Sequence, residues 1–288
     1  MKIPQGAFEL YDAYCHGGIS RRRFMDGLAK FAVGGASVAA LAEAMLPDYA
    51  NAQQIRENDE RIIGRRITYP SPDGAGEMGG YLVRPAGAAA PLGGVVVIHE
   101  NRGLNPHIAD VARRAALAGY LTLAPDALYP LGGYPGNDDD GRTMQRRRDR
   151  NEMLEDFIAA VGFLQRHEDC TGSVGCVGFC YGGSVSNMLA VRIPDLACAV
   201  PFYGGWPDAA DAERVNAPLL IHLAGLDERV NAGWPAYKAA LDAAGKDYTV
   251  HVYEDTNHGF HNDTTARYDA EAAALAWERT LAFFGAHI

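Results

Sequence analysis

The chain has 288 residues, of which 48% are hydrophobic and 22% charged, and its formal net charge at pH 7 is -10. This length and composition predict a folded protein with a substantial core and exclude extensive disorder. The acidic balance argues against nucleic acid as a partner, because phosphate binding requires a basic face. The five cysteines have no metal-type spacing, and a chain of this length does not need disulfides, so we expect free thiols.

Residues 1–52 differ from the rest of the chain. A twin-arginine pattern, Ser20-Arg21-Arg22-Arg23-Phe24-Met25, is followed by an uncharged run from Phe31 to Ala42 and by the small residues Ala50-Asn51-Ala52. This order is typical of an export signal that the Tat machinery recognises and a peptidase removes, here after Ala52, which would place the protein in the periplasm. The alternative is a retained N-terminal helical segment in a cytoplasmic protein. The apolar run is too short to span a bilayer.

From about Arg61 onward, apolar runs alternate with helical patterns. In chain order, we expect strands at 65–74, 79–85, 93–100, 120–126, 173–179, 197–204, 217–227 and 248–255, the first two as edge strands. We expect helices around 108–116 and at 151–167, 182–192, 231–245 and 264–284. Strands that alternate with long helices predict an α/β fold, in which one mostly parallel sheet over residues 53–288 has helices on both faces.

The residues that follow the strands carry the candidate chemistry, because function collects at the carboxyl ends of such a sheet. Cys180 lies between Gly178 and Gly182 where a strand meets a helix, which predicts a tight turn that lifts one reactive side chain clear of the sheet. Asp227 and His258 follow later strands, in the nucleophile–acid–base order of α/β-hydrolases. An imidazole can take the proton of a thiol near neutral pH, and a carboxylate can fix the tautomer of that imidazole.

These residues lie in motifs that resemble those of the dienelactone hydrolases (carboxymethylenebutenolidases), and the resemblance covers nearly all of residues 60–288. The motifs are VVVIHENRGLNPHIADVARRAALAGY, APDAL, GFCYGG, GLDERV and NHGFHN. The resemblance implies an α/β-hydrolase fold and a triad of Cys180, Asp227 and His258. It also implies that Glu100 contacts the nucleophile and helps to form the thiolate when substrate arrives.

The resemblance further implies an oxyanion hole made by the backbone N–H groups of Tyr181 and Asn101, in agreement with the general rule for these hydrolases. Asn262 stands where the family has one of the arginines that hold the substrate carboxylate, so the identity of the substrate stays open. Four further residues near strand ends are candidates for the substrate pocket: Tyr203, Trp206, Trp234 and His261. Such aromatic side chains can equally be packing residues.

The sequence therefore predicts a hydrolase of small esters or lactones that forms a covalent thioester at Cys180 and needs no metal or organic cofactor. Two alternatives stay open, a redox-active thiol protein and a non-catalytic binding protein with the hydrolase fold. Two charged runs receive plainer interpretations. We expect Asp138-Asp139-Asp140 to be a solvated loop rather than a metal site, and Arg146-Arg147-Arg148 to be an exposed helix face.

Overall fold

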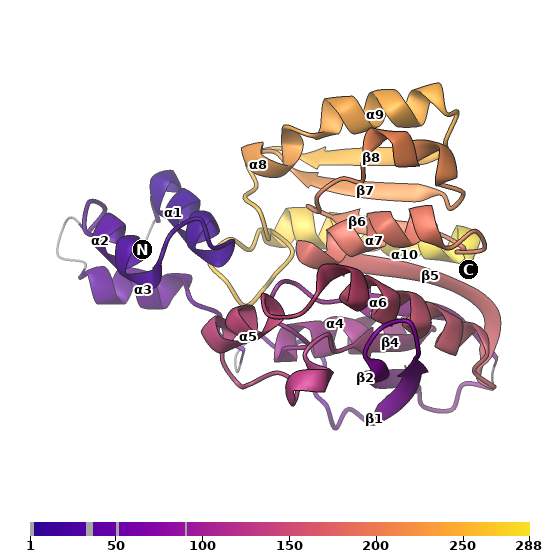
Figure 1. Cartoon of the computed structure of the whole chain (residues 1–288). Coiled ribbons are helices and arrows are strands. Elements are labelled where there is room, and N and C mark those ends of the chain that lie inside the picture. The colour runs from indigo at the N-terminus through magenta and orange to yellow at the C-terminus, as the bar shows by residue number, and fades with distance from the viewer. Residues whose placement is uncertain (1–2, 33–36, 50–51, 90) are drawn as a thin grey trace.

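A computed structural model describes residues 3–32, 37–49, 52–89 and 91–288. An eight-stranded sheet crosses the molecule in the order β1-β2-β4-β3-β5-β6-β7-β8 (Figure 1). β1 and β2 pair antiparallel, β2 and β4 also pair antiparallel, and all other neighbours are parallel. The strands are β1 (Ile62–Ser71), β2 (Gly76–Pro85), β3 (Leu92–Ile98), β4 (Leu121–Pro125), β5 (Cys170–Phe179), β6 (Ala199–Phe202), β7 (Leu219–Ala224) and β8 (Tyr248–Tyr253).

Helices cover both faces of this sheet, which explains why its central strands are apolar throughout. On β3, Val96 and Ile98 face one core cluster, while Val95 and Val97 face the other. Successive side chains on a strand point to opposite faces, so a strand that is covered twice must be hydrophobic at every position. The first cluster is closed by α6 (Arg150–Gln165), α7 (Tyr181–Arg192) and α9 (Trp234–Ala243), and the second by α4 (Pro106–Leu117) and α10 (Ala270–His287).

The predicted α/β class and the order of its elements are confirmed, with several local differences. Of the two strands expected at an edge, β1 lies there and β2 does not, because β2 is inserted between β1 and β4; the opposite edge is formed by β8. The helix expected at 231–245 is divided into α8 (Glu228–Asn231) and α9, and the last helix begins at Ala270, where the Asp269 side chain accepts a hydrogen bond from the N–H of Ala272. The triple-aspartate run is not a loop, since it opens α5 (Asp138–Gln145).

The N-terminal segment forms helices of its own: α1 (Gln5–Cys15), α2 (Arg21–Leu28) and α3 (Val38–Met45). They enclose a separate hydrophobic cluster that includes Tyr11 and Phe24. Figure 1 shows them beside the main body, at the end of the molecule towards which β7 and β8 point. Ala50 and Asn51 of the predicted cleavage site lie outside the described residues. None of the helices in the described ranges combines the length and hydropathy that a membrane span requires.

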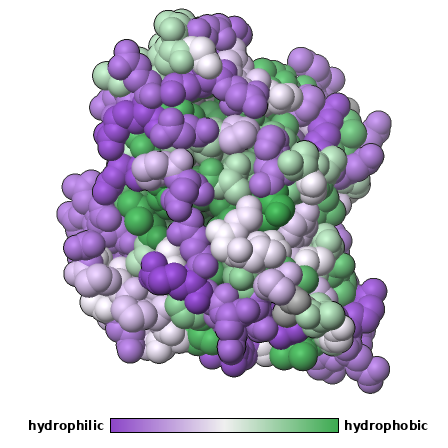
Figure 2. Space-filling model, turned by 90° about the vertical axis from the view of Figure 1, so that its right-hand side faces the viewer, coloured by the Kyte–Doolittle hydropathy of each residue, from purple (hydrophilic) through white to green (hydrophobic). Residues whose placement is uncertain are grey.

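Figure 2 shows the face of the molecule that is turned away from the N-terminal helices. Polar residues predominate on this face, and hydrophobic residues occur in small patches between them. Single exposed hydrophobic residues are normal on a folded protein and do not by themselves indicate a binding surface. The features that bear on function gather at the opposite end, where α1 approaches the carboxyl ends of the parallel strands.

Candidate active site

Cys180 occupies the sharp turn between β5 and α7 that the glycine spacing predicts. Its backbone has φ 58° and ψ -111°, a conformation that costs a non-glycine residue about 1–3 kcal/mol and is typical of functional sites. The turn requires glycine at both flanking positions. A Cβ at Gly178 would overlap the main chain of Gly182, and a Cβ at Gly182 would overlap the carbonyl group of Ile98. The thiol therefore lies at the start of α7, where the helix dipole favours an anion.

Asp227 and His258 form a buried hydrogen-bonded pair beside this turn. The His258 Nδ1 atom lies 2.5 Å from Asp227 Oδ2, and both side chains are at most 5% exposed. Asp227 is also the N-cap of α8, since its Oδ1 accepts a hydrogen bond of 3.2 Å from the N–H of Val230. Although burial opposes the change, the charge of His258 lowers the pKa of Asp227. Among the described residues, His258 Nε2 has no hydrogen-bond partner.

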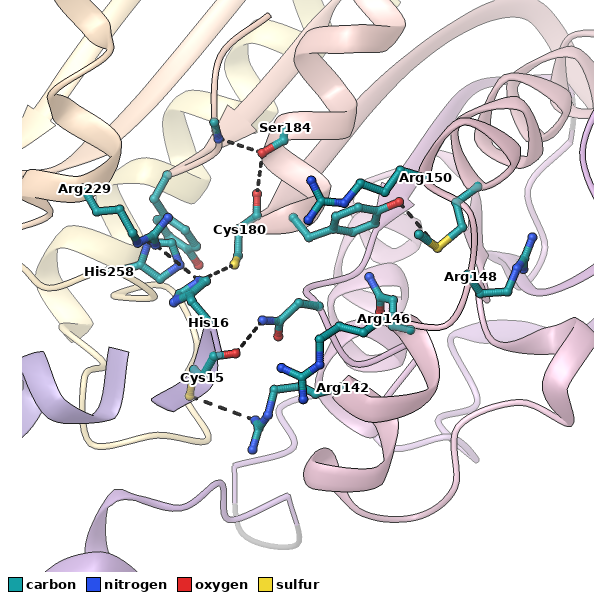
Figure 3. Close-up of a pocket in the computed structure, with 16 residues that line it drawn as sticks. Cys15, His16, Arg142, Arg146, Arg148, Arg150, Cys180, Ser184, Arg229 and His258 are labelled. Carbon is teal, nitrogen blue, oxygen red and sulfur yellow. Dashed lines mark hydrogen bonds between the residues drawn. The ribbon is translucent and has the colours of Figure 1, made fainter. Parts of the chain in front are cut away.

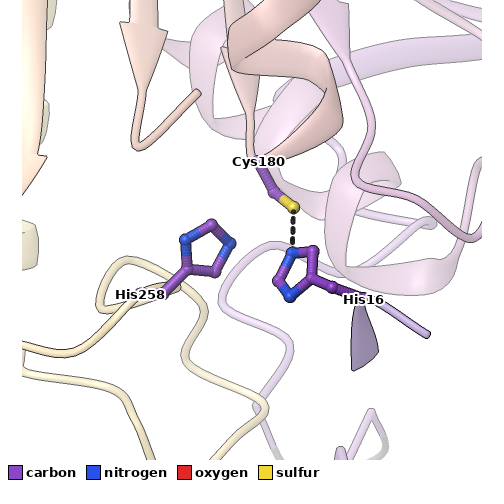
Figure 4. A group of neighbouring side chains, drawn as sticks. All are labelled: His16, Cys180 and His258. Atoms are coloured by element: carbon purple, nitrogen blue, oxygen red, sulfur yellow. Dashed lines mark hydrogen bonds between the residues drawn. The ribbon is translucent and has the colours of Figure 1, made fainter. Parts of the chain in front are cut away.

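A second histidine, His16, reaches the thiol from the end of α1. Its Nε2 atom lies 3.3 Å from Cys180 Sγ, and its Nδ1 atom lies 2.8 Å from the carbonyl oxygen of Asp12 and 3.2 Å from Asp12 Oδ1 (Figure 4). The rings of His16 and His258 meet edge to face, with centroids 4.8 Å apart. Sequence reasoning missed His16, because it treated residues 1–52 only as an export signal or a helical segment. The one sequence signal was the spacing of Asp12 and His16, four residues apart.

Arg229 connects the two histidine–aspartate pairs. Its Nε atom donates to Asp12 Oδ2 at 3.2 Å, and its Nη2 atom lies 3.2 Å from both His16 Nε2 and His258 Nδ1. The guanidinium comes from α8, directly after Asp227, and its side chain is 47% exposed. The N-terminal helices are thus bound to α8, the short helix that Asp227 caps.

These neighbours change the ionisation of the thiol. Burial alone would raise the pKa of Cys180, but the charges of His258 and His16 lower it to about 5. Burial would correspondingly lower the pKa of His16, but the thiolate of Cys180 and the carboxylate of Asp12 raise it to about 10. The pKa of His258 is raised against burial by the same thiolate and by Asp227. These shifts favour a thiolate beside a protonated His16 at neutral pH, the reactive form of a cysteine nucleophile.

Glu100 lies at the end of β3 with its carboxylate fully buried. Its Oε2 atom accepts a hydrogen bond of 3.0 Å from Asn262 Nδ2 and lies 3.2 Å from Arg102 Nη2. Arg102 in turn pairs with Asp138 at 2.6 Å. Burial would raise the pKa of Glu100, but the charge of Arg102 lowers it. Asn262, at the position of a family arginine, thus binds Glu100, whereas the hydrogen bond to the thiol comes from His16.

A cavity of about 290 Å³ opens above the thiol, and Figure 3 shows the side chains around it. Tyr181, Asn101 and Tyr203 all line it. Tyr181 is the first residue of α7, where main-chain N–H groups lack a partner within the helix and can bind an oxyanion. The side chain of Asn101 donates a hydrogen bond of 2.8 Å to the carbonyl oxygen of Cys15.

Arginines form much of the remaining cavity lining. The five that contribute are Arg142, Arg146, Arg148, Arg150 and Arg229. Arg142 pairs with Asp139, and the buried Arg148 pairs with Glu152 and Asp156. The expectation that Arg146-Arg147-Arg148 form an exposed helix face is therefore wrong, because the run lies in the turn between α5 and α6 and Arg148 is buried. Within the described ranges, neither Arg146 nor Arg150 has a carboxylate at ion-pair distance. These two guanidinium groups are exposed to solvent at the cavity and can bind an anion.

Three of the residues predicted to line a pocket pack elsewhere. Trp206 donates from Nε1 to the carbonyl oxygen of Val230 at 2.8 Å, and its ring centroid lies 5.2 Å from that of Trp234. His261 is buried and stacks on Phe179, with centroids 4.9 Å apart. None of these three side chains is among the described residues around the cavity at Cys180. Their contacts are those of packing residues behind the site.

The donor atoms of His16, Cys180 and His258 lie within 4.8 Å of one another, which is also close enough for one metal ion to contact all three. We interpret this group as a nucleophile with its bases, because the thiol lies on the strand-to-helix turn and above an oxyanion-binding helix terminus. The aspartates behind both imidazoles then fix the tautomers that such bases require.

Comparisons with known proteins agree with this geometry. The chain is 56% identical over 110 residues to the "Putative hydrolase fragment YghX" of Escherichia coli K12, covering 38% of this chain and 94% of that protein. It is 29% identical over 245 residues to a "Putative carboxymethylenebutenolidase" of Escherichia coli O157:H7, covering 80% of this chain and 89% of that protein. A crystal structure of a putative dienelactone hydrolase from Klebsiella pneumoniae superposes with a TM-score of 0.68 at 28% identity, covering 78% of this chain and 98% of that chain.

Two family models match the chain. A model described as YqhI-like covers residues 1–34, which include α1, α2 and His16. The model of the dienelactone hydrolase family covers residues 78–288, which include Glu100, Cys180, Asp227 and His258. The chain therefore belongs to the dienelactone hydrolase family, whose members are α/β-hydrolases that act on esters and lactones.

Proposed function

We propose that this chain hydrolyses small carboxylic esters or lactones that carry a negative charge, through a covalent thioester at Cys180. The observation that carries the proposal is the strained turn that holds Cys180 beside the buried His258–Asp227 pair. A thiol with a pKa of about 5 is ionised at neutral pH and is ready to attack a carbonyl carbon.

The reaction follows from the groups in place. The thiolate attacks the carbonyl carbon, a C–S bond forms, and the carbonyl oxygen becomes an oxyanion that the N–H groups of Tyr181 and Asn101 stabilise. The C–O bond then breaks, and the leaving alkoxide takes the Nε2 proton of His258. A water molecule returns a proton to His258 and attacks the thioester, which releases the acid and regenerates the thiolate. Asp227 holds the His258 ring and stabilises its charged form throughout.

The charge of the substrate is inferred from the cavity. Arg146, Arg150 and Arg229 bring guanidinium groups to the space beside the thiol, and guanidinium groups bind carboxylates and phosphates in a bidentate manner. The proposal does not name dienelactone, because the position of one family arginine is occupied here by Asn262, which binds Glu100.

The test compares wild type, Cys180→Ala and Cys180→Ser on p-nitrophenyl acetate, on the p-nitrophenyl monoester of succinate and on a phosphate triester. We expect the alanine variant to lose hydrolysis and the serine variant to be far weaker than wild type, because a hydroxyl group is much harder to deprotonate than a thiol. The succinate monoester should be preferred over the acetate. Cys170→Ala, at the other end of β5, is the matched control and should keep wild-type activity.

Iodoacetamide labelling adds a check that does not depend on the substrate. Inactivation of the wild type under reducing conditions should parallel modification of Cys180. The modified residue is mapped by mass spectrometry, because Cys15 also lines the cavity and could be alkylated instead. An alanine variant that retains full hydrolysis would overturn the proposal. A redox-active thiol protein would instead show a reducible change at Cys180 in peroxide and no turnover of any ester.

A further inference from the structure

Two histidine–aspartate pairs meet at one thiol, and only one of them comes from the hydrolase sheet. Asp227 and His258 follow β7 and β8, whereas Asp12 and His16 lie in and just after α1. Each imidazole has its Nδ1 atom at a carboxylate. Figure 4 shows both rings beside Cys180, with the hydrogen bond from His16 to the sulfur. A cysteine hydrolase needs a single such pair to move its proton. The second pair therefore requires an explanation.

We infer that His16, oriented by Asp12, is a catalytic residue that serves as the standing counter-ion of the Cys180 thiolate, so that the N-terminal helices complete the active site. This inference deepens the proposed function, because it takes Cys180 as the nucleophile. The contact that carries it is the 3.3 Å separation between His16 Nε2 and Cys180 Sγ, the hydrogen bond that the structure gives to the thiol.

The two histidines then have different tasks. The thiol proton moves to His16 Nε2 before substrate binds, which leaves an S⁻ and an imidazolium. His258 carries the proton that the leaving alkoxide takes and recovers one from water, while His16 keeps its proton through the cycle. No proton is lost or gained in the sum, which is ester plus water giving acid plus alcohol. With a permanent imidazolium at the sulfur, the nucleophile stays charged in the resting enzyme.

Glu100 is already engaged and does not supply this function in the structure. Its carboxylate is neutralised by Arg102 and hydrogen-bonded by Asn262. The groups that do face His16 come from three other elements as well as from α1. They are Asp12 of α1, Cys180 at the turn, His258 of the loop after β8 and Arg229 of α8. Two of them, the thiolate and the Asp12 carboxylate, stabilise the imidazolium, whereas the partly exposed Arg229 and the protonated His258 oppose it.

The N-terminal helices are fixed at the site by polar contacts as well as by packing. Asp12 pairs with Arg229 at 3.2 Å and with the buried Arg267 at 3.6 Å. Gln5 donates to Asn257, next to His258, at 2.7 Å, and Arg21 pairs with Asp139 of α5 at 2.8 Å. Contacts to two sides of the cavity hold α1 in a defined position, which a counter-ion that lies 3.3 Å from the sulfur requires.

The test measures the rate of Cys180 alkylation by iodoacetamide between pH 4 and pH 10, in EDTA, for the full-length wild type, His16→Gln and Asp12→Asn. The wild-type profile should have its inflection near pH 5. In His16→Gln we expect the inflection to rise by about one to three pH units, the usual effect of removing an opposite charge at this distance. Asp12→Asn should give a smaller rise in the same direction, because it weakens the imidazolium without removing it.

Ester hydrolysis supplies a second readout that a merely structural change would not reproduce. If the inflection of His16→Gln lies near pH 7, hydrolysis should fall about tenfold at pH 6 and less than twofold at pH 8.5, since the thiolate re-forms in alkali. A structural defect would lower activity equally at both pH values. Tyr14→Phe is the control, because it removes a contact between α1 and Asp139 two residues from His16 and should leave the inflection unchanged.

Several outcomes would overturn the inference. An inflection in His16→Gln that matches wild type would show that His16 does not support the thiolate. Faster hydrolysis with an unchanged inflection would show that His16 covers the thiol. A thermal melt confirms that each variant is folded before it is compared, and Asp12→Asn gives a second measurement should His16→Gln be unstable. Failure of the proposed function is seen separately, as a wild type that hydrolyses no ester although Cys180 alkylates normally.

Discussion

Replacing Arg102 with methionine should destabilise the protein and weaken the loop that begins at Glu100. Arg102 is 2% exposed and lies 3.2 Å from Glu100 Oε2 and 2.6 Å from Asp138 Oδ2, so its loss removes the ion-pair partner of two carboxylates. Removing one partner of a buried ion pair costs about 3–5 kcal/mol. Although two carboxylates lose their partner, the total cost should stay within this range, because Asn262 still donates a hydrogen bond to Glu100 and Tyr49 still donates one to Asp138.

This deficit should depend on pH in a defined direction. Burial would raise the pKa of Glu100 and of Asp138, but the charge of Arg102 lowers both values in the wild type. The stability that these two carboxylates contribute is therefore complete above the ordinary carboxyl pKa, and it is lost as the pH falls through the lowered values. In Arg102→Met, burial raises the pKa of both carboxyl groups without the opposing charge of Arg102, so they take up protons at a higher pH than in the wild type. The gap in stability between wild type and Arg102→Met should therefore be widest near pH 7.5 and narrower at pH 4.5. By thermal melting, about 3–5 kcal/mol corresponds to a lower Tm by roughly 6–20 °C.

Arg61→Met is the matched control, because Arg61 pairs with Asp59 at the surface, where solvent screens the pair and its loss changes stability little. If Arg102→Met shifted the Tm no more than this control, or by the same amount at both pH values, the account of the buried cluster would be refuted.

Three further predictions concern the site. Asp227→Asn should lower kcat by about 10³–10⁴-fold, because the amide favours the wrong His258 tautomer, although asparagine keeps the N-cap of α8; steady-state kinetics check this. Glu100→Gln should lower kcat/KM less than tenfold and leave the alkylation inflection of Cys180 in place, because Arg102 already neutralises that carboxylate; a displaced inflection would support the role that the family resemblance implies. N-terminal sequencing of protein isolated from its native host should show a chain that begins before His16. A chain that begins at Gln53, together with loss of export when Arg21 and Arg22 are replaced with lysine, would support a cleaved signal and contradict a catalytic His16.

Much of the fold could be predicted because the signals were local. The apolar run of β3 and the glycines around Cys180 each have one physical explanation, a doubly covered strand and a turn without room for a Cβ. The same holds for Asp227 and His258, which follow strands whose carboxyl ends meet at one edge. Such residues are brought together by topology alone, and topology is what the alternating pattern predicts.

The rest depended on long-range contacts that no local pattern reveals. His16 meets Cys180 across 164 residues, and its only local signal was the i,i+4 spacing to Asp12. Arg148 looks exposed within a run of arginines, but Asp156 lies two turns along the chain and binds it in the core. His261 lies in the same motif as His258, yet its ring turns to Phe179 rather than to the cavity. Whether an exposed-looking charge or ring becomes buried is decided by tertiary packing.

The measurement that tests the central claim most directly is intact-protein mass spectrometry of the enzyme mixed rapidly with a p-nitrophenyl ester and quenched in acid. Acid preserves a thioester while stopping its hydrolysis. A thiolate nucleophile predicts one acyl group per chain, mapped to the peptide that contains Cys180, together with a burst of p-nitrophenol that is absent in Cys180→Ala. Turnover without any acyl adduct on Cys180, or an adduct on another residue with the burst intact in Cys180→Ala, would contradict the claim that this cysteine carries the reaction.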